Sequence, residues 1–243
     1  MTAIALLFLV QLQPLEKAVE AARKESKPVL CFIHRKDWTG EEKAGKALSD
    51  LLGVLAPKVV LAHKDVGAEE KLMAAWKMKR ADSAFVVIDP FALQPRDQAL
   101  GRFEEDEGRI TPENVKAFVE EALKRWAEFV SSRAALERLW AAMKKPDYDA
   151  FKAALWPAQV AEMGEEKVHK LFDTAVADLK RVDRIEQNAV DLRDVHVKLK
   201  ESDPTLEAMW QVRFVMILAD GKRDGTSMPV VRTPRGYFVQ WVN

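Results

Sequence analysis

Four side chains near the ends of two predicted strands are of the types that bind metal ions. His34 and Asp37 follow one apolar run, and His63 and Asp65 lie within the next. If the two runs are neighbouring strands, His34 and Asp37 come close to Asp65. A catalytic metal site needs three converging ligands and an open position, which this spacing does not specify. We therefore interpret the four as polar surface residues and expect neither a metal nor another cofactor.

Cys31 is the only cysteine in the 243 residues, and it lies inside the apolar run VLCFI. A single thiol excludes an intrachain disulfide, a CxxC redox pair and a metal site with several thiolate ligands. A cysteine with apolar neighbours behaves as a small buried hydrophobic residue. We predict an inert core thiol; the alternative, a monothiol that acts through Cys31, requires that reagents reach the sulfur.

The segment KDWTGEEK, residues 36–43, places a polar turn between that run and an amphipathic stretch. Thr39 and Glu42 have the spacing of the S/T-x-x-E capping box, in which each side chain accepts a hydrogen bond from the backbone N–H of the other residue. A threonine hydroxyl cannot replace a nucleophilic thiolate, because a protein environment does not lower its pKa far enough. We therefore predict a structural helix start at this turn rather than a catalytic one.

Charge and motifs exclude several classes of function. Lysine plus arginine and aspartate plus glutamate number 38 each, so the charge balance implies no nucleic acid or other polyanionic partner. The sequence contains no P-loop, GxGxxG, GxSxG or HExxH pattern, so phosphate, dinucleotide, serine-hydrolase and zincin chemistry lack support. No apolar stretch reaches the roughly 18 residues that cross a bilayer.

The first 13 residues are open to two interpretations, because residues 3–10 are uniformly apolar. Their length suits the hydrophobic region of a signal segment, although the basic start and a clear cleavage pattern are missing. A buried first strand explains the same apolar run. The signal interpretation favours export to a periplasm, and the strand interpretation favours the cytoplasm.

Helical and strand patterns alternate over residues 14–126, as in an α/β fold. Amphipathic stretches with apolar residues on one face predict helices, and continuous apolar runs predict strands buried on both faces. The expected helices cover residues 14–27, 44–55 and 68–78, and the expected strands cover 29–33, 59–66 and a run from 84.

A long helix is expected to join the two halves of the chain. Thr111 and Pro112 provide an N-cap and a proline at the first helical position. The helical pattern then continues past Trp126 to Lys144. At 1.5 Å per residue this helix is about 50 Å long, which is enough to serve two domains.

The element order over residues 14–126, together with KPVLCFIHRKDWTGEEK, resembles the thioredoxin superfamily. The residues that match the family's W-C-G-x-C-K turn are Trp38, Gly40 and Lys43. Thr39 and Glu42 stand where the two cysteines would be, and Ser83 takes the place of the family's cis-proline. The resemblance implies a thioredoxin-like fold that has lost both the sulfurs of disulfide exchange and the proline that shapes the substrate groove.

Residues 127–243 have helices first and strands last, which is typical of an α+β fold. In MWQVRFVMIL the alternation assigns Trp210, Val212, Phe214, Met216 and Leu218 to a core, and TPRG predicts a terminal hairpin. A change of strand phase near Arg193 and Asp194 predicts a bulge. With LERLWAAMKKPDYDAFKAALWP, this order resembles the NTF2-like (SnoaL-like) fold, whose helices pack on the concave face of a curved antiparallel sheet.

The second resemblance implies a cone that can hold a small ligand, and some members of this group use an aspartate and a histidine there for proton transfer. The available candidates are Asp191, Asp194 and His196. Their alternative role is that of outward polar residues on a half-solvated sheet.

From the sequence we expect a redox-inactive thioredoxin-like domain followed by an NTF2-like domain, acting as a protein-interaction or scaffold module whose partner is another protein. The alternative is a small-ligand binder or proton-transfer enzyme that uses the C-terminal cone. Disulfide oxidoreductase activity is not expected in either case.

Overall fold

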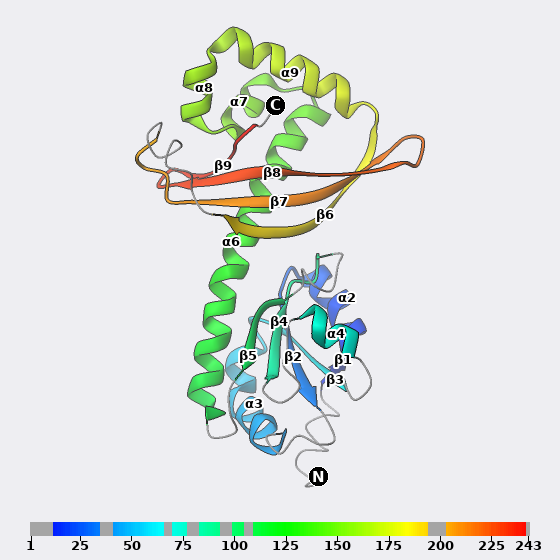
Figure 1. The fold of residues 1–243 in the computed structure, drawn as a ribbon, viewed down its shortest axis with the longest axis vertical. Helices are drawn as coiled ribbons and strands as arrows, with labels where there is room; N and C mark the ends of the chain where they lie inside the picture. The colour runs from blue at the N-terminus through cyan, green and yellow to red at the C-terminus, as the bar shows by residue number, and fades with distance from the viewer. Residues whose placement is uncertain are drawn as a thin grey trace. The chain divides into compact units, whose positions relative to one another are not determined.

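The computed structural model describes residues 12–34, 41–65, 70–76, 83–92, 99–104, 109–193 and 203–241. The chain divides into two compact units, residues 1–127 and 128–243. Each unit contains helices and a β-sheet, so the chain has a mixed α/β architecture (Figure 1).

The first unit is built around a mixed sheet with the strand order β1-β3-β2-β4-β5. β1, β3 and β2 run parallel, whereas β4 and β5 are antiparallel to their neighbours. The elements are β1 (Gln13–Pro14), α2 (Leu15–Glu25), β2 (Val29–His34), α3 (Glu41–Leu55), β3 (Val60–Asp65), α4 (Glu70–Ala75), β4 (Ser83–Ile88), β5 (Ala99–Glu104) and the first half of α6 (Pro112–Lys144).

The central strand β2 is buried on both faces, as its continuous apolar run predicts. Cys31 and Ile33 pack with Ala18 of α2 in one apolar cluster. On the other face Phe32 packs against Phe85 of β4, with 5.6 Å between the ring centroids. Figure 1 shows α2 and α4 on one side of the sheet and α3 on the other. The sheet is therefore a middle layer between helices.

Helix α6 begins and ends where the sequence predicts. The backbone N–H of Asn114 donates to Thr111 Oγ1 at 3.3 Å, which satisfies one of the free donors at a helix start. The helix runs without interruption to Lys144. It contributes buried residues to each unit, namely Val115, Val119, Ala122 and Trp126 to the first and Leu136, Leu139, Trp140 and Met143 to the second.

The second unit consists of helices packed on one face of a curled antiparallel sheet with the order β6-β7-β8-β9 (Figure 1). After α6 its elements are α7 (Tyr148–Ala154), α8 (Pro157–Met163), α9 (Glu165–Leu179), β6 (Val182–Arg193), β7 (Ala208–Leu218), β8 (Arg223–Thr233) and β9 (Gly236–Val239).

Strand β7 follows the predicted alternation as far as Phe214. At its end Met216 and Leu218 are only half-buried, and Ile217 of the other set is buried instead. Trp210, Val212 and Phe214 are buried, and Phe214 meets Trp140 of α6 edge to face at 4.9 Å between ring centroids. The helix α7 starts at Asp147, whose Oδ1 accepts from the backbone N–H of Ala150 at 2.9 Å. The sheet face and the helix caps are thus both encoded locally.

The terminal hairpin is also confirmed, because β8 and β9 pair antiparallel from Thr233 and Gly236 outward. Gly236 closes the turn with a φ of 128°, a backbone conformation that side chains with a Cβ rarely adopt.

Two strands begin earlier than the sequence pattern predicts. The apolar pattern places one strand near Val190 and another in MPVVR from Met228, whereas β6 starts at Val182 and β8 starts at Arg223. The first residues of β8 are exposed, so they have no apolar partner that would impose a period of two. β6 contains two register shifts, between Val182 and Arg184 and between Gln187 and Ala189.

Other predictions meet the limits of the described residues. Helix α4 covers residues 70–75 of the expected 68–78. The bulge predicted near Arg193 and Asp194 falls at the edge of the described range and stays a prediction. In the described parts of the chain, no helix is long and apolar enough to cross a membrane.

Candidate functional site

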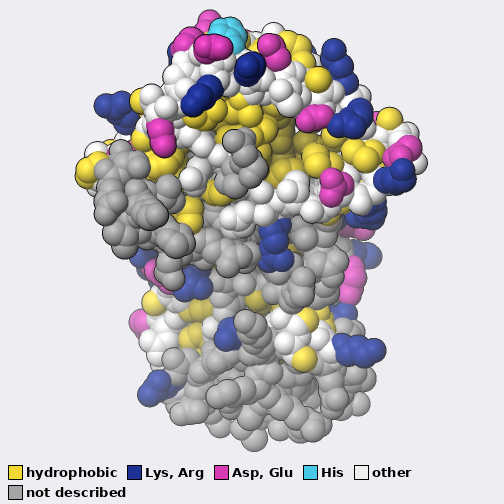
Figure 2. Space-filling view, turned by 45° about the horizontal axis from the view of Figure 1, so that its top comes forward, with side chains coloured by type: hydrophobic (Ala, Val, Ile, Leu, Met, Phe, Trp, Pro, Cys, Tyr) yellow, Lys and Arg dark blue, Asp and Glu magenta, His cyan; other side chains and the backbone are white. Residues whose placement is uncertain are grey.

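The second unit contains a cavity of about 480 Å³ between its helices and its sheet. Pockets that hold small molecules typically measure about 300 to 1,000 Å³. Figure 2 shows hydrophobic side chains gathered on this part of the surface, with acidic and basic side chains around them. The size and the lining of the cavity are those of a binding site for a small, mainly apolar molecule.

The wall of the cavity is aromatic and sulfur-rich. Trp140 and Met143 come from α6, Phe214 and Met216 from β7, and Met228 from β8. Methionine side chains are unbranched and polarizable, so they adapt to ligands of different shape. The wall therefore favours apolar contact over hydrogen bonding and selects weakly for shape.

Trp241 completes the wall and is held there by two hydrogen bonds to one side chain of α8. The amide of Gln159 donates to the Trp241 carbonyl at 2.6 Å and accepts from the Trp241 N–H at 2.8 Å. The indole ring lies 6.0 Å from Phe151 of α7, measured between ring centroids. The segment after β9 is thus fixed to two helices.

One end of the cavity carries charged side chains. Asp178 belongs to the last turn of α9, Arg181 follows that helix, and Asp224 lies near the start of β8. Arg181 donates to Asp178 Oδ1 at 2.6 Å. Along this end the described residues give Asp224 no ion pair. Among the described residues, the lining charges therefore sum to one excess negative charge.

An ion-pair network joins α6 to the sheet. Arg232 of β8 pairs with Glu128 of α6, and its Nε lies 2.8 Å from a carboxylate oxygen of Glu207. The hydroxyl of Tyr237 donates to the other oxygen of Glu128. The guanidinium carbon lies 5.6 Å from the centroid of the Trp210 ring, within the range of a cation–π contact.

Burial and charge act in opposite directions on this network. Burial disfavours the charged form of Arg232, but the hydrogen bond to Tyr237 and the carboxylate of Glu128 outweigh it, and the arginine pKa is raised. Burial, followed by the hydrogen bond to Glu128, raises the pKa of Tyr237. The network thus favours a charged arginine and a neutral tyrosine at neutral pH.

A second polar contact holds α7 to α9. The Tyr148 hydroxyl donates to Glu165 Oε1 at 2.8 Å, and its ring stacks on His169 with 3.6 Å between centroids. Partial burial and the bond to Glu165 raise the pKa of Tyr148 to about 12. Its neutral form therefore persists throughout the physiological range, and the contact is structural.

The described residues do not test whether the proton-transfer candidates meet. Asp191 lies in β6 in register with Gln211 of β7, and its side chain lies outside the described residues. Asp194 and His196 also lie outside them. The proton-transfer role of these three residues stays a prediction.

The turn predicted to replace a redox site is described only at its edges. Glu42 lies in the first turn of α3, and Ser83 is the first residue of β4 in register with Glu104. The side chains of both, and the whole of Trp38, Thr39 and Gly40, lie outside the described residues. The capping box therefore stays a prediction.

The structure confirms the prediction that Cys31 is a core residue. Its exposed fraction is 0%, and burial raises the pKa of its thiol far above the ordinary range. A protonated thiol without solvent access is a poor nucleophile.

The metal candidates give no site in the part of the chain that is described. His63 and Asp65 lie in β3, but the side chains of His34 and Asp37 are not described. Among the described residues no three histidine, cysteine, aspartate or glutamate side chains could hold a metal together.

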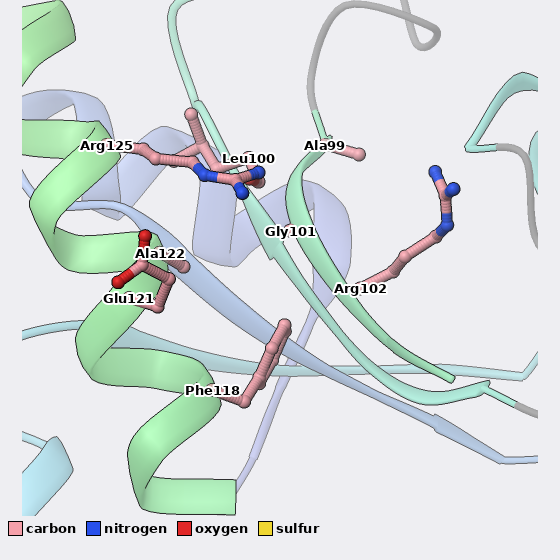
Figure 3. Close-up of a pocket in the computed structure, with 8 residues that line it drawn as sticks. All are labelled: Ala99, Leu100, Gly101, Arg102, Phe118, Glu121, Ala122 and Arg125. Carbon is pink, nitrogen blue, oxygen red and sulfur yellow. The ribbon is translucent and has the colours of Figure 1, made fainter. Parts of the chain in front are cut away.

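The first unit has a hollow between β5 and α6 with a volume of about 410 Å³ (Figure 3). Gly101 permits a close approach there, because a Cβ on it would meet Phe118 at 3.2 Å. Arg125 reaches over from α6 and donates to the Leu100 carbonyl at 3.1 Å. In Figure 3 Arg102 points away from α6. Both arginines that line the hollow are engaged by backbone carbonyls, Arg125 as above and Arg102 by that of Trp76 at 3.3 Å, so we regard it as a packing feature.

The charged end of the cavity was not found from the sequence. Asp224 and Met228 have the spacing of side chains on one face of a strand, but the segment DGKRDG, residues 220–225, has the composition of a turn. The chain turns at residues 219–222, and Arg223 already pairs with Ile217. Extending the strand from Met228 back to Arg223 would have placed the side chains of Asp224 and Met228 on one face of it.

Three comparisons with known proteins returned nothing: no protein-family model, no curated protein and no solved structure matches this chain.

We predict that iodoacetamide does not alkylate Cys31 in the native protein, because the sulfur is buried and protonated. Mass spectrometry should show an unmodified chain in buffer and a single adduct after unfolding in guanidinium chloride. Rapid labelling of the native chain would contradict the buried thiol.

Proposed function

We propose that the first unit is a redox-inactive thioredoxin-like domain that acts in protein interaction. The observation that carries this proposal is the state of Cys31, the only sulfur of the chain that could form a disulfide, which lies inaccessible in the central strand. Disulfide exchange requires a reachable thiolate. A unit without a reachable thiolate cannot act by disulfide exchange, and we propose that it acts by binding other proteins with its surface.

The sheet of the first unit supports the thioredoxin-like assignment. Its elements follow the order expected from the resemblance, with β2 leading through the turn into α3 and with β4 and β5 antiparallel before α6. Fold does not determine function, so the loss of the two cysteines decides what the unit does.

We predict that cysteines introduced at positions 39 and 42 restore dithiol chemistry. The T39C/E42C variant should form an intramolecular disulfide on mild oxidation, because these positions correspond to the family's two cysteines, and it should reduce insulin disulfides. The native chain and each single variant should be inactive. Two introduced thiols that stay separate, or an active native chain, would contradict the assignment.

If the first unit acts in protein interaction, we expect its partner to bind at the turn of residues 36–43. A photocrosslinking amino acid placed at position 38 in the native cell should yield one dominant protein adduct, since the family's turn faces its substrates. The same group at Ala177, an exposed residue of α9, serves as the control. Identical adducts from both positions, or none from position 38, would rule out docking at the turn.

We further propose that the second unit is an NTF2-like domain that binds a small ligand in its cavity. The cavity of about 480 Å³, lined by tryptophan, phenylalanine and methionine, supports this second function. It lies between the helices and the curled sheet, the position that the resemblance implies.

Filling the cavity should block binding. Ala175 lines it from α9, whereas Ala177 on the same helix is exposed. The neutral dye Nile red should bind one molecule per chain with enhanced fluorescence. Ala175→Phe should weaken binding at least about tenfold by placing a ring in the cavity, while Ala177→Phe should bind normally. Thermal unfolding of both variants checks that each is folded.

A further inference from the structure

The cavity of the second unit is polarised along its length. Its apolar end is formed by Trp140, Phe214, Met228 and Trp241. The opposite end is formed where α9 ends and the strands β6 and β8 begin. Val182 pairs with Leu218, and Met216 pairs with Asp224. The start of β6, the end of β7 and the start of β8 therefore lie side by side at the same end of the strands.

The charged end has an excess of negative charge among the residues that line it. Two carboxylates, those of Asp178 and Asp224, face one guanidinium, that of Arg181. Because Arg181 is already bonded to Asp178 at 2.6 Å, that pair is neutral. The charge of Asp224 is left over.

The two cations that directly precede Asp224 each pair with another carboxylate. Lys222 pairs with Asp220 at 2.9 Å, and Arg223 pairs with Glu186 at 3.2 Å. Lys180 follows α9 but is not among the residues that line the cavity.

The end of helix α9 adds to the negative potential. Its last turn contains no basic residue, and the free carbonyls of a helix C-terminus carry a partial negative charge. Asp178 lies in this turn, and Leu179, which also lines the cavity, is the last residue of the helix. The carbonyls of this helix end and Asp224 therefore favour the same sign of ligand charge, and the cations Lys180, which is the C-cap residue, and Arg181 oppose them.

From this arrangement we infer that the ligand is an amphiphile with an elongated apolar body and one positively charged group, such as an amine. The apolar body lies against the aromatic and methionine wall, and the cation lies at Asp224 and the end of α9. This inference rests on the proposed ligand-binding function and specifies the chemical class of the ligand.

The test compares three probes that share a twelve-carbon alkyl chain and differ in their head groups. Dodecylamine, dodecanol and laurate, each below its micelle concentration, compete with Nile red for the native protein at low salt. The amine should compete about fivefold better than the alcohol, the scale of an exposed ion pair, and laurate should compete worst. Added salt should reduce the difference, because it screens exposed charges.

Variants at the exposed residue Asp224 test whether its charge causes the preference for the amine. Asp224→Asn should bring the amine close to the alcohol, and Asp224→Lys should invert the order in favour of laurate. Asp220→Asn is the matched control, because Asp220 lies in the turn just before β8 and does not line the cavity, and it should leave the order unchanged. Nile red binding itself should persist in all three variants.

The outcomes separate the two proposals. If Nile red binds but the alcohol competes as well as the amine, the inference about charge is overturned and ligand binding stands. If the preference persists in both Asp224 variants, the cation site is elsewhere and the inference is also overturned. If Nile red does not bind the native chain, the proposed ligand-binding function fails and the inference fails with it.

Discussion

The packing of α6 on the sheet of the second unit depends on how one partly buried arginine is neutralised. An arginine removed from water must be paired, because an uncompensated buried charge costs several kcal/mol. Arg232 meets this requirement with two carboxylates, one of which, Glu128, belongs to α6. Trp140 lies 12 residues further along the same helix, about 18 Å at the rise of an α-helix. The ion pair between Glu128 and Arg232 thus fixes the position of α6 along the sheet, and with it the place where Trp140 packs on the sheet.

Much of the fold could be predicted because local signals were strong. Thr111 and Pro112 mark the start of α6, the capping carboxylate of Asp147 marks the start of α7, and the alternation through Trp210 marks the buried face of β7. The starts of β6 and β8 could not be predicted, since exposed strand residues carry no apolar period. Whether a strand extends past its buried part is decided by pairing with a distant neighbour.

The candidate site was predictable only in its general position. The resemblance pointed to a cavity between helices and sheet and to Asp191, Asp194 and His196, which stay predictions. It did not point to Asp178 and Asp224, the carboxylates that line the cavity among the described residues. These two are 46 residues apart in the sequence. Only the return of the chain through β6 and β7 brings them to one end of the cavity, and no local pattern encodes such a meeting.

The burial of Cys31 has a practical consequence for work in solution. Because the chain has no other cysteine, a fluorophore or spin label attached through one thiol added at the surface reports on that position alone, without a cysteine-free background having to be engineered first. The interior of the sheet keeps its native sulfur, so the labelled protein retains the packing of the original.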